Sequence, residues 1–193
     1  MKKLTLADLL SNAAYEKQRP TLRQAILEHK KKRRVPLGPN ATLHFEDRMN
    51  MRYQVQELMR SERINRLEDI EEELAVYNPL IPDGSNLKVT FMIEYPDEAE
   101  RRIQLSRLIG IEHRIGIVIA GLDPVYPIAN EDLERSTPEK TSSVHFMRFE
   151  FTPQAIAAAK AGAAWEIRCE HPAYQHSTVL PDPVRESLVK DFQ

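Results

Sequence analysis

The chain has 193 residues and a net charge of -2, with 27 Lys and Arg against 29 Asp and Glu. A chain of this length can bury roughly 70% of the surface that it exposes when unfolded. Its single cysteine, Cys169, excludes an internal disulfide framework and an all-cysteine zinc or iron–sulfur site within one chain. The first apolar run is too short for a signal peptide, and no window approaches 18 apolar residues. We therefore expect a reduced, cytoplasmic protein that does not enter a membrane.

The first 78 residues have mainly helical patterns. Thr5 and Asp8 have the spacing of a helix N-cap and a first-turn carboxylate, which predicts a short helix. Pro20 is typical of a first helical turn and predicts that a second helix begins there. Apolar residues at helical and at alternating spacing predict the remaining elements, namely a strand over 41–46, a long amphipathic helix over 47–64 and a helix over 66–77.

Beyond residue 79, strand and helix patterns follow in the order β-α-β-β-α-β. This order is that of a ferredoxin-like antiparallel sheet with helices on one face. The expected elements are strands over 87–95, 113–121, 142–151 and 164–171, helices over 96–109 and 153–162, and a last helix after Pro183. We therefore predict an α+β fold, with a helical region over 1–78 packed on a ferredoxin-like region over 79–193.

The strand over 142–151 has one apolar and one mixed face. Period-two alternation places His145, Met147, Phe149 and Phe151 on one side. The other side holds Val144, Phe146, Arg148 and Glu150. A mixed face suits a covering helix better than open water, and the helix over 47–64 is predicted to supply that cover.

The two parts of the chain carry opposite charge. Up to Arg66 there are 15 Lys and Arg against 7 Asp and Glu, a net of +8, and the rest of the chain carries -10. Opposite charges attract, so we expect the two regions to form one cooperative unit. A homodimer formed through the sheet or the helical surface is a further prediction.

Several long motifs carry a family resemblance. They are NPLIPDG, FMIEYPDEAERR, EDLER, KTSSVHFMRFE and HPAY. With them the chain resembles the bacterial domain-of-unknown-function family 3501, from MKKLTLADLL nearly to the C-terminus. The family lends no catalytic residues. Its members are often encoded beside rubrerythrin-like and iron–sulfur oxidoreductase genes, and the resemblance therefore implies a non-catalytic accessory protein with a partner from such a redox system.

The candidate metal ligands are Cys169, His171 and His176. The first two share a strand face, and His176 can return after a turn, but the spacing matches no standard zinc motif. The chain also lacks the Glu-x-x-His pairs of di-iron helical bundles and the common nucleotide-binding and hydrolase motifs. We therefore predict no metal and no cofactor.

The candidate nucleic-acid contacts are five adjacent cations, Lys30, Lys31, Lys32, Arg33 and Arg34. Such a run attracts phosphates in a salt-dependent manner. The alternative is that cations in a last helical turn interact favourably with the negative end of the helix dipole. Stacking aromatics do not accompany the run, so nucleic-acid binding is the less favoured interpretation.

The candidate catalytic or ligand-binding residues are Glu57, Arg60, Glu94, His145 and Arg148. They would converge in a polar pocket between the helix over 47–64 and the sheet. The alternative for the helix residues is a set of weak surface ion pairs at three- and four-residue spacing. Three functions thus stay open: an accessory protein, a small-ligand binder or enzyme that uses this pocket, and an RNA-binding module.

Overall fold

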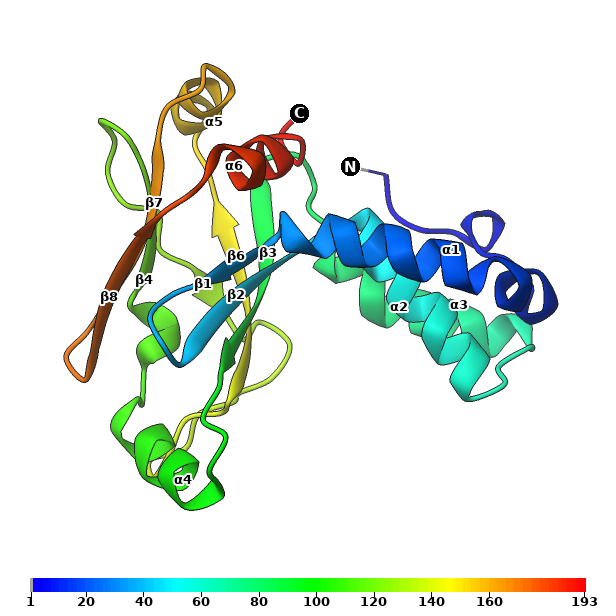
Figure 1. Cartoon of the computed structure of the whole chain (residues 1–193), viewed down its shortest axis with the longest axis horizontal. Coiled ribbons are helices and arrows are strands. Elements are labelled where there is room, and N and C mark those ends of the chain that lie inside the picture. Colours follow the sequence, from blue (N-terminus) through cyan, green and yellow to red (C-terminus); the bar gives the residue numbers. More distant parts are fainter. Residues whose placement is uncertain (1) are drawn as a thin grey trace.

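Two antiparallel sheets form the centre of the computed structural model, which describes residues 2–193 (Figure 1). Sheet A has the strand order β1-β2-β3-β6-β5, and sheet B has the order β4-β7-β8. The strands of sheet A are β1 (Arg34–Pro36), β2 (Ala41–Glu46), β3 (Asn86–Ile93), β6 (Val144–Glu150) and β5 (Ile128–Ala129). The strands of sheet B are β4 (Ile115–Ile119), β7 (Trp165–His171) and β8 (Tyr174–Val179). The predicted α+β class is confirmed.

The single ferredoxin-like sheet is not confirmed. Of the four strands expected beyond residue 79, β3 pairs with β6 in sheet A, whereas β4 pairs with β7 in sheet B. In a ferredoxin-like sheet, β4 would pair with the free edge of β6, and β7 with the free edge of β3. Here β5 occupies that edge of β6, and β2 occupies that edge of β3. The remaining two strands pair with each other and add β8.

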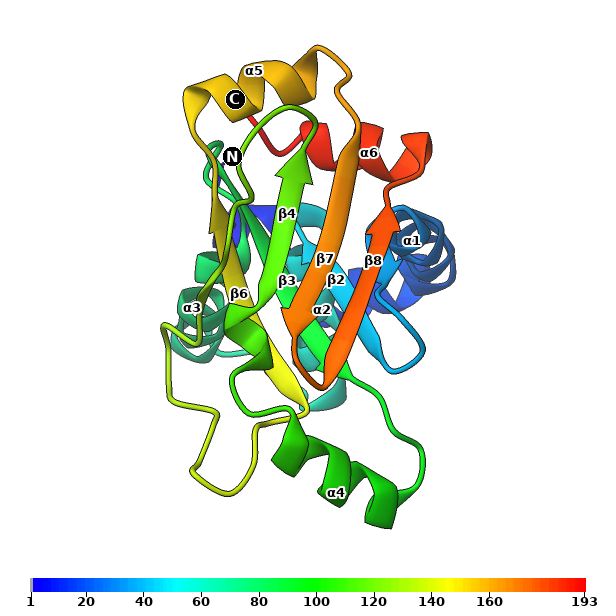
Figure 2. The same cartoon turned by 90° about the vertical axis from the view of Figure 1, so that its left-hand side faces the viewer.

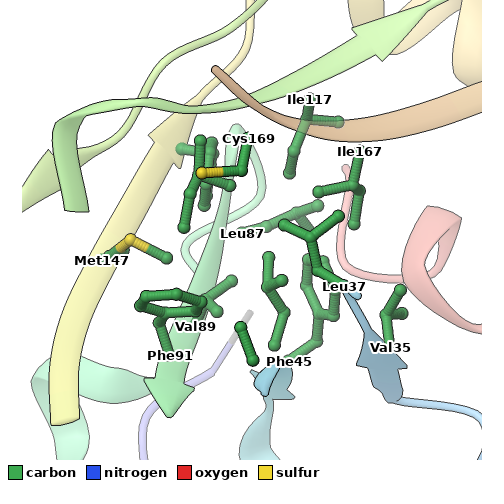
Figure 3. Packing of buried hydrophobic residues seen from close by; sticks show 14 of the residues in the cluster. Val35, Leu37, Phe45, Leu87, Val89, Phe91, Ile117, Met147, Ile167 and Cys169 are labelled. Atoms are coloured by element: carbon green, nitrogen blue, oxygen red, sulfur yellow. The ribbon is translucent and has the colours of Figure 1, made fainter. Parts of the chain in front are cut away.

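The main core lies between the two sheets, which pack face to face (Figure 2). Period-two alternation turns every second side chain of each strand inward. On β6 the inward residues are His145, Met147 and Phe149, as predicted, and all are buried. Figure 3 shows Ile117, Ile167 and Cys169 of sheet B above residues of sheet A such as Leu87 and Phe91.

Three helices lie at the ends of the sandwich, where they cover its core (Figures 1 and 2). At one end is α4 (Glu98–Arg107), and at the other are α5 (Pro153–Lys160) and α6 (Asp182–Val189). Each contributes buried apolar residues to the core, namely Leu105, Ala155, Ala159, Val184 and Leu188. The C-terminal α6 is thereby placed beside the end of α1.

A helical arm extends from sheet A on the side away from sheet B (Figure 1). It consists of α1 (Asn12–Lys31), α2 (Arg48–Ser61) and α3 (Leu67–Tyr77), with the short 3₁₀ helix η1 (Leu6–Asp8). Further 3₁₀ turns are η2 (Asn78–Leu80) and η3 (Ile111–His113). The arm has its own apolar core, formed by Leu4, Met51, Val55, Met59, Ile70, Leu74 and Ile81. None of the helices within residues 2–193 combines the length and apolar character needed to cross a bilayer.

Two helix predictions need correction. The second helix begins at Asn12 rather than Pro20, because Ser11 accepts a hydrogen bond from the Ala14 amide and starts the helix earlier. Pro20 therefore lies inside α1, on an exposed side where water can hydrate the carbonyl that lacks its usual partner. The helix predicted over 47–64 does not cover the mixed face of the sheet. As α2 it packs on α1 and α3, and only its first turn lies at sheet A.

Candidate functional site

A polar cleft of about 430 Å³ lies where the end of α1, the start of α2 and α6 meet. Because α6 packs on one end of the sandwich and α1 begins the arm, the cleft joins segments from both ends of the sequence (Figures 1 and 2). Its lining is almost entirely polar: Glu28, His29, Lys32, Arg33, Asp47, Pro183, Glu186, Ser187, Lys190 and Asp191.

Arg33 forms the floor of the cleft, and its side chain is only 2% exposed. It follows the C-cap residue of α1, Lys32, and the next residue, Arg34, begins β1. The guanidinium donates to three backbone carbonyls, those of Phe45 (3.0 Å), Glu46 (3.2 Å) and Ser187 (3.2 Å). It also forms ion pairs with Asp191 and, at 3.4 Å, with Asp47. A rigid guanidinium with five donors is suited to holding a helix, a strand and two carboxylates together.

His29 and Asp47 form a pair on the wall of the cleft. His29 lies in the last turn of α1 and its Nε2 donates to Asp47 Oδ2 at 2.6 Å. The other carboxylate oxygen of Asp47 caps α2 by accepting from the Asn50 amide at 2.9 Å. The imidazole side chain is 25% exposed, whereas the carboxylate is 9% exposed. Asp47 thus fixes the ring, which lines the cleft and stays partly exposed.

Burial and charge act differently on the two acids beside Arg33. Burial raises the pKa of Asp191 to about 6, although the guanidinium opposes this shift. Burial also acts to raise the pKa of Asp47, but the His29 hydrogen bond and Arg33 outweigh it and hold that pKa below its usual value. The cleft therefore has one carboxylate that stays ionised through mild acid and one that does not.

The five residues predicted to converge on one pocket lie in four separate places. Glu57 lies in the arm, where it accepts from Tyr15 (2.7 Å) and pairs with Arg19 (2.7 Å) and Arg60 (3.5 Å). The Arg19 hydrogen bond lowers the pKa of Glu57 to about 2.

Glu94 and Arg148 lie away from this cluster. Glu94 accepts from Thr42 Oγ1 at 2.5 Å. Arg148 forms ion pairs with Glu131 at 2.8 Å and with Glu150 at 2.6 Å. These are structural ion pairs rather than one shared site.

The fifth of these residues, His145, lies fully buried between β6 and the loop before it. Its Nε2 is 3.0 Å from the Ser142 carbonyl, which can only accept, so Nε2 carries the proton. The other nitrogen then accepts from Asn130 Nδ2 at 3.1 Å. Burial lowers the pKa of His145, although the Glu112 carboxylate, 4.0 Å from Nδ1, opposes the shift. His145 is therefore a neutral structural histidine.

We expect this histidine to make the protein less stable in mild acid. Its folded pKa lies below the unfolded value of about 6.5, so the unfolded chain binds more protons as the pH falls through 6.5. His145→Gln keeps a donor and an acceptor but cannot titrate. Between pH 7.5 and 5, the free energy of unfolding measured with urea should therefore fall by about 1–2 kcal/mol more in the natural chain than in this variant. An equal loss in both chains would contradict the assignment, and exposed His176→Gln serves as the control.

The candidate metal ligands do not converge. Cys169 is buried and His171 donates from Nε2 to the Ile109 carbonyl at 3.1 Å. His176 lies opposite Cys169 in the β7–β8 pair, but its ring packs on Tyr174, with centroids 4.5 Å apart. Burial raises the pKa of the Cys169 thiol, which disfavours the thiolate that metals bind. Among residues 2–193, no three His, Cys, Asp or Glu side chains are grouped as metal ligands.

The basic run is divided by the fold. Arg33 is buried in the cleft floor, whereas Lys31 pairs with Glu28 at 2.7 Å and Arg34 lies 3.9 Å from Glu94. The Lys30 ammonium lies 5.9 Å from the centre of the Tyr53 ring. Lys32 lines the cleft. The sequence therefore located part of the site, but it missed His29, Asp47 and Asp191, which no spacing rule brings together.

The whole chain matches one family model. Residues 3–192 match the family described as Protein of unknown function (DUF3501). The chain belongs to the DUF3501 family. Its structure is similar to a crystal structure at 1.90 Å resolution of a novel protein of unknown function from Burkholderia pseudomallei K96243, with 44% sequence identity and a TM-score of 0.93. The alignment covers 100% of both chains, so this DUF3501 protein shares the complete two-sheet fold with helical arm. A search of curated proteins found no match.

Proposed function

We propose that this DUF3501 protein binds a small anionic ligand in the cleft between α1 and α6. The observation that carries the proposal is the closed floor of Arg33, Asp47 and Asp191 beneath a partly exposed His29. At about 430 Å³ the cleft falls within the range of small-molecule sites, roughly 300–1,000 Å³. The floor is fixed by buried hydrogen bonds, so binding would require little reorganisation.

Two lysines on the rim supply donors for an anion. Within the described part of the chain, Lys32 and Lys190 line the cleft without an ion-pair partner, whereas Glu28 is paired with Lys31. Glu186 is the one rim acid left to oppose the two lysines. The second nitrogen of His29, which Asp47 does not occupy, adds a hydrogen-bonding group beside them. A carboxylate or phosphate group can accept from both lysines, and a phosphate hydroxyl can donate to this second nitrogen when only Nε2 carries a proton.

The other two functions stay predictions. An accessory role beside a rubrerythrin-like or iron–sulfur oxidoreductase partner implies an interaction surface, and within residues 2–193 the exposed large apolar residues do not mark one. The exposed large apolar residues are spread over the molecule: Leu67 and Val76 lie near opposite ends of α3, Ile103 on α4 and Val179 on β8. RNA binding through residues 30–34 loses support because Arg33 cannot reach a phosphate without breaking its buried contacts.

Titration of the full-length, ¹⁵N-labelled protein with inorganic phosphate, and separately with succinate, tests the proposal. We expect at least one anion to cause saturable shifts of amide signals over residues 28–33 and 186–191. Lys190→Gln should weaken binding about tenfold, because a hydrogen bond to a charged group contributes about 1.5–3 kcal/mol. Lys160→Gln, a change in an exposed lysine at the end of α5, should leave the affinity unchanged.

Two results would contradict the proposal. One is the absence of saturable shifts with either anion at roughly 10 mM, where a ligand with a Kd of about 1 mM would be mostly bound. The other is an equal loss of affinity in the Lys190 and Lys160 variants, which would indicate general electrostatic attraction rather than a site.

A further inference from the structure

A second polar pocket lies on the other side of Arg33, against the outer face of sheet A. It has a volume of about 160 Å³ and is separate from the cleft described above. Sheet A contributes His44, Glu46, Thr90 and Met92, the first turn of α2 contributes Asn50, and the last turn of α1 contributes Lys30. The pocket thus lies where the helical arm joins the sheet.

Asn50 lines this pocket and has an unused acceptor. The residue is 2% exposed, and its Nδ2 donates to the Phe45 carbonyl at 3.2 Å. Because a carbonyl can only accept, the amide nitrogen must face Phe45 and the amide oxygen must face the other way. That oxygen has no hydrogen-bond partner among residues 2–193. A buried polar atom of this kind requires a water molecule or a ligand as its donor.

Two neighbouring side chains also have hydrogen-bonding atoms that are not fully used. Glu46 is 7% exposed, and its Oε1 accepts from Thr90 Oγ1 at 2.8 Å, which leaves lone pairs on the other oxygen. The Nε2 atom of His44 is buried and has no partner in the described chain. Burial raises the pKa of Glu46 and lowers that of His44, because it removes the water that hydrates both side chains. A guest that hydrogen-bonds to them would replace that water.

Lys30 supplies the opposite charge on the pocket wall. It is half-buried, and within the described residues it forms no ion pair. The nearby Arg33 is already satisfied by carbonyls and carboxylates. The pocket therefore combines acceptors from Asn50 and Glu46 with one available cationic donor.

We infer that this pocket binds a small amino acid, with its ammonium group donating to Asn50 and Glu46 and its carboxylate accepting from Lys30. A donor-only cation would leave Lys30 unpaired, and an acceptor-only anion would leave the Asn50 oxygen unpaired. The volume holds roughly five water-sized groups at about 30 Å³ each, which restricts the guest to a molecule such as glycine. The inference does not depend on the anion proposed for the cleft.

Glycine is the probe, and the full-length ¹⁵N-labelled protein is the target. We expect saturable shifts of the Asn50 side-chain amide and of the Thr90 backbone amide at millimolar glycine. Acetate and methylammonium, which each keep one half of the molecule, should bind at least tenfold more weakly. Lys30→Met should weaken glycine binding about tenfold, whereas Lys31→Met, which changes the adjacent exposed lysine, should not.

Three results would overturn the inference. The first is no saturable response to glycine at roughly 50 mM, which would mean that the pocket holds water only. At this concentration even a weak guest with a Kd of about 10 mM would be mostly bound. The second is equal binding of acetate and glycine, which would make it an anion site. The third is a response confined to α6, which would place glycine in the cleft.

Discussion

Replacing Arg33 with methionine should destabilise the protein by about 3–5 kcal/mol. The change keeps much of the buried volume, but it removes the partner of Asp191 and the donors to three backbone carbonyls. Breaking a buried ion pair from one side leaves an uncompensated charge in a low-dielectric environment. Unfolding by urea at pH 7, followed by circular dichroism, measures the loss.

The neighbouring Lys31 provides the matched control. It is an exposed residue in an exposed ion pair with Glu28, so Lys31→Met should change the stability by less than about 1 kcal/mol. A double variant, Arg33→Met with Asp191→Asn, should be more stable than the sum of the two single changes predicts, because it removes the orphaned charge. Strict additivity would mean that the two side chains do not act as a pair.

Asp191→Asn should remove the effect of pH on this part of the molecule. The folded pKa of Asp191 is raised to about 6 by burial, whereas the unfolded value is 3.8. Between these two values the folded chain binds more protons than the unfolded chain, so stability falls as the pH rises from about 4 to 6. Asparagine cannot titrate. As the pH rises from 4 to 7, the free energy of unfolding of the variant should therefore increase by about 3 kcal/mol relative to that of the natural chain.

The difference between the two chains isolates this carboxylate. His145 acts in the opposite direction, but it is present in both chains and cancels. Asp47 has a lowered pKa, so it stays ionised across the window. Urea unfolding at pH 4, 5, 6 and 7 gives the curve. A stability difference that does not change with pH would show that Asp191 is already ionised at pH 4.

Local patterns predicted the elements whose cause is local. The Thr5–Asp8 cap is present, with the Thr5 amide donating to Asp8 at 2.8 Å, because its partners are three residues apart. The inward and outward faces of β6 were also predictable, since strand geometry alone sets a period of two. The start of α1 was not, because the weak signal of Ser11 was outweighed by the strong but misleading one of Pro20.

The pairing of the strands was decided by competition for sheet edges. The β1 strand is three residues long and β5 is two, both too short for a periodic signal, and β8 has exposed polar residues instead of alternation. Once β2 and β5 occupy the edges of β3 and β6, no edge is left for β4 and β7. Such edge occupancy depends on contacts between distant residues, which a local pattern does not contain.

By itself, the sequence determined the α+β class, most of the elements, the inward face of β6 and the family to which the chain belongs. The tertiary structure alone decided the division into two sheets and the composition of the cleft. Arg33 lies 158 residues from Asp191, and they meet only because α6 packs on the sandwich beside the end of α1. A charge run in a sequence does not show which cation will be buried, since burial is determined by the segments that pack around it.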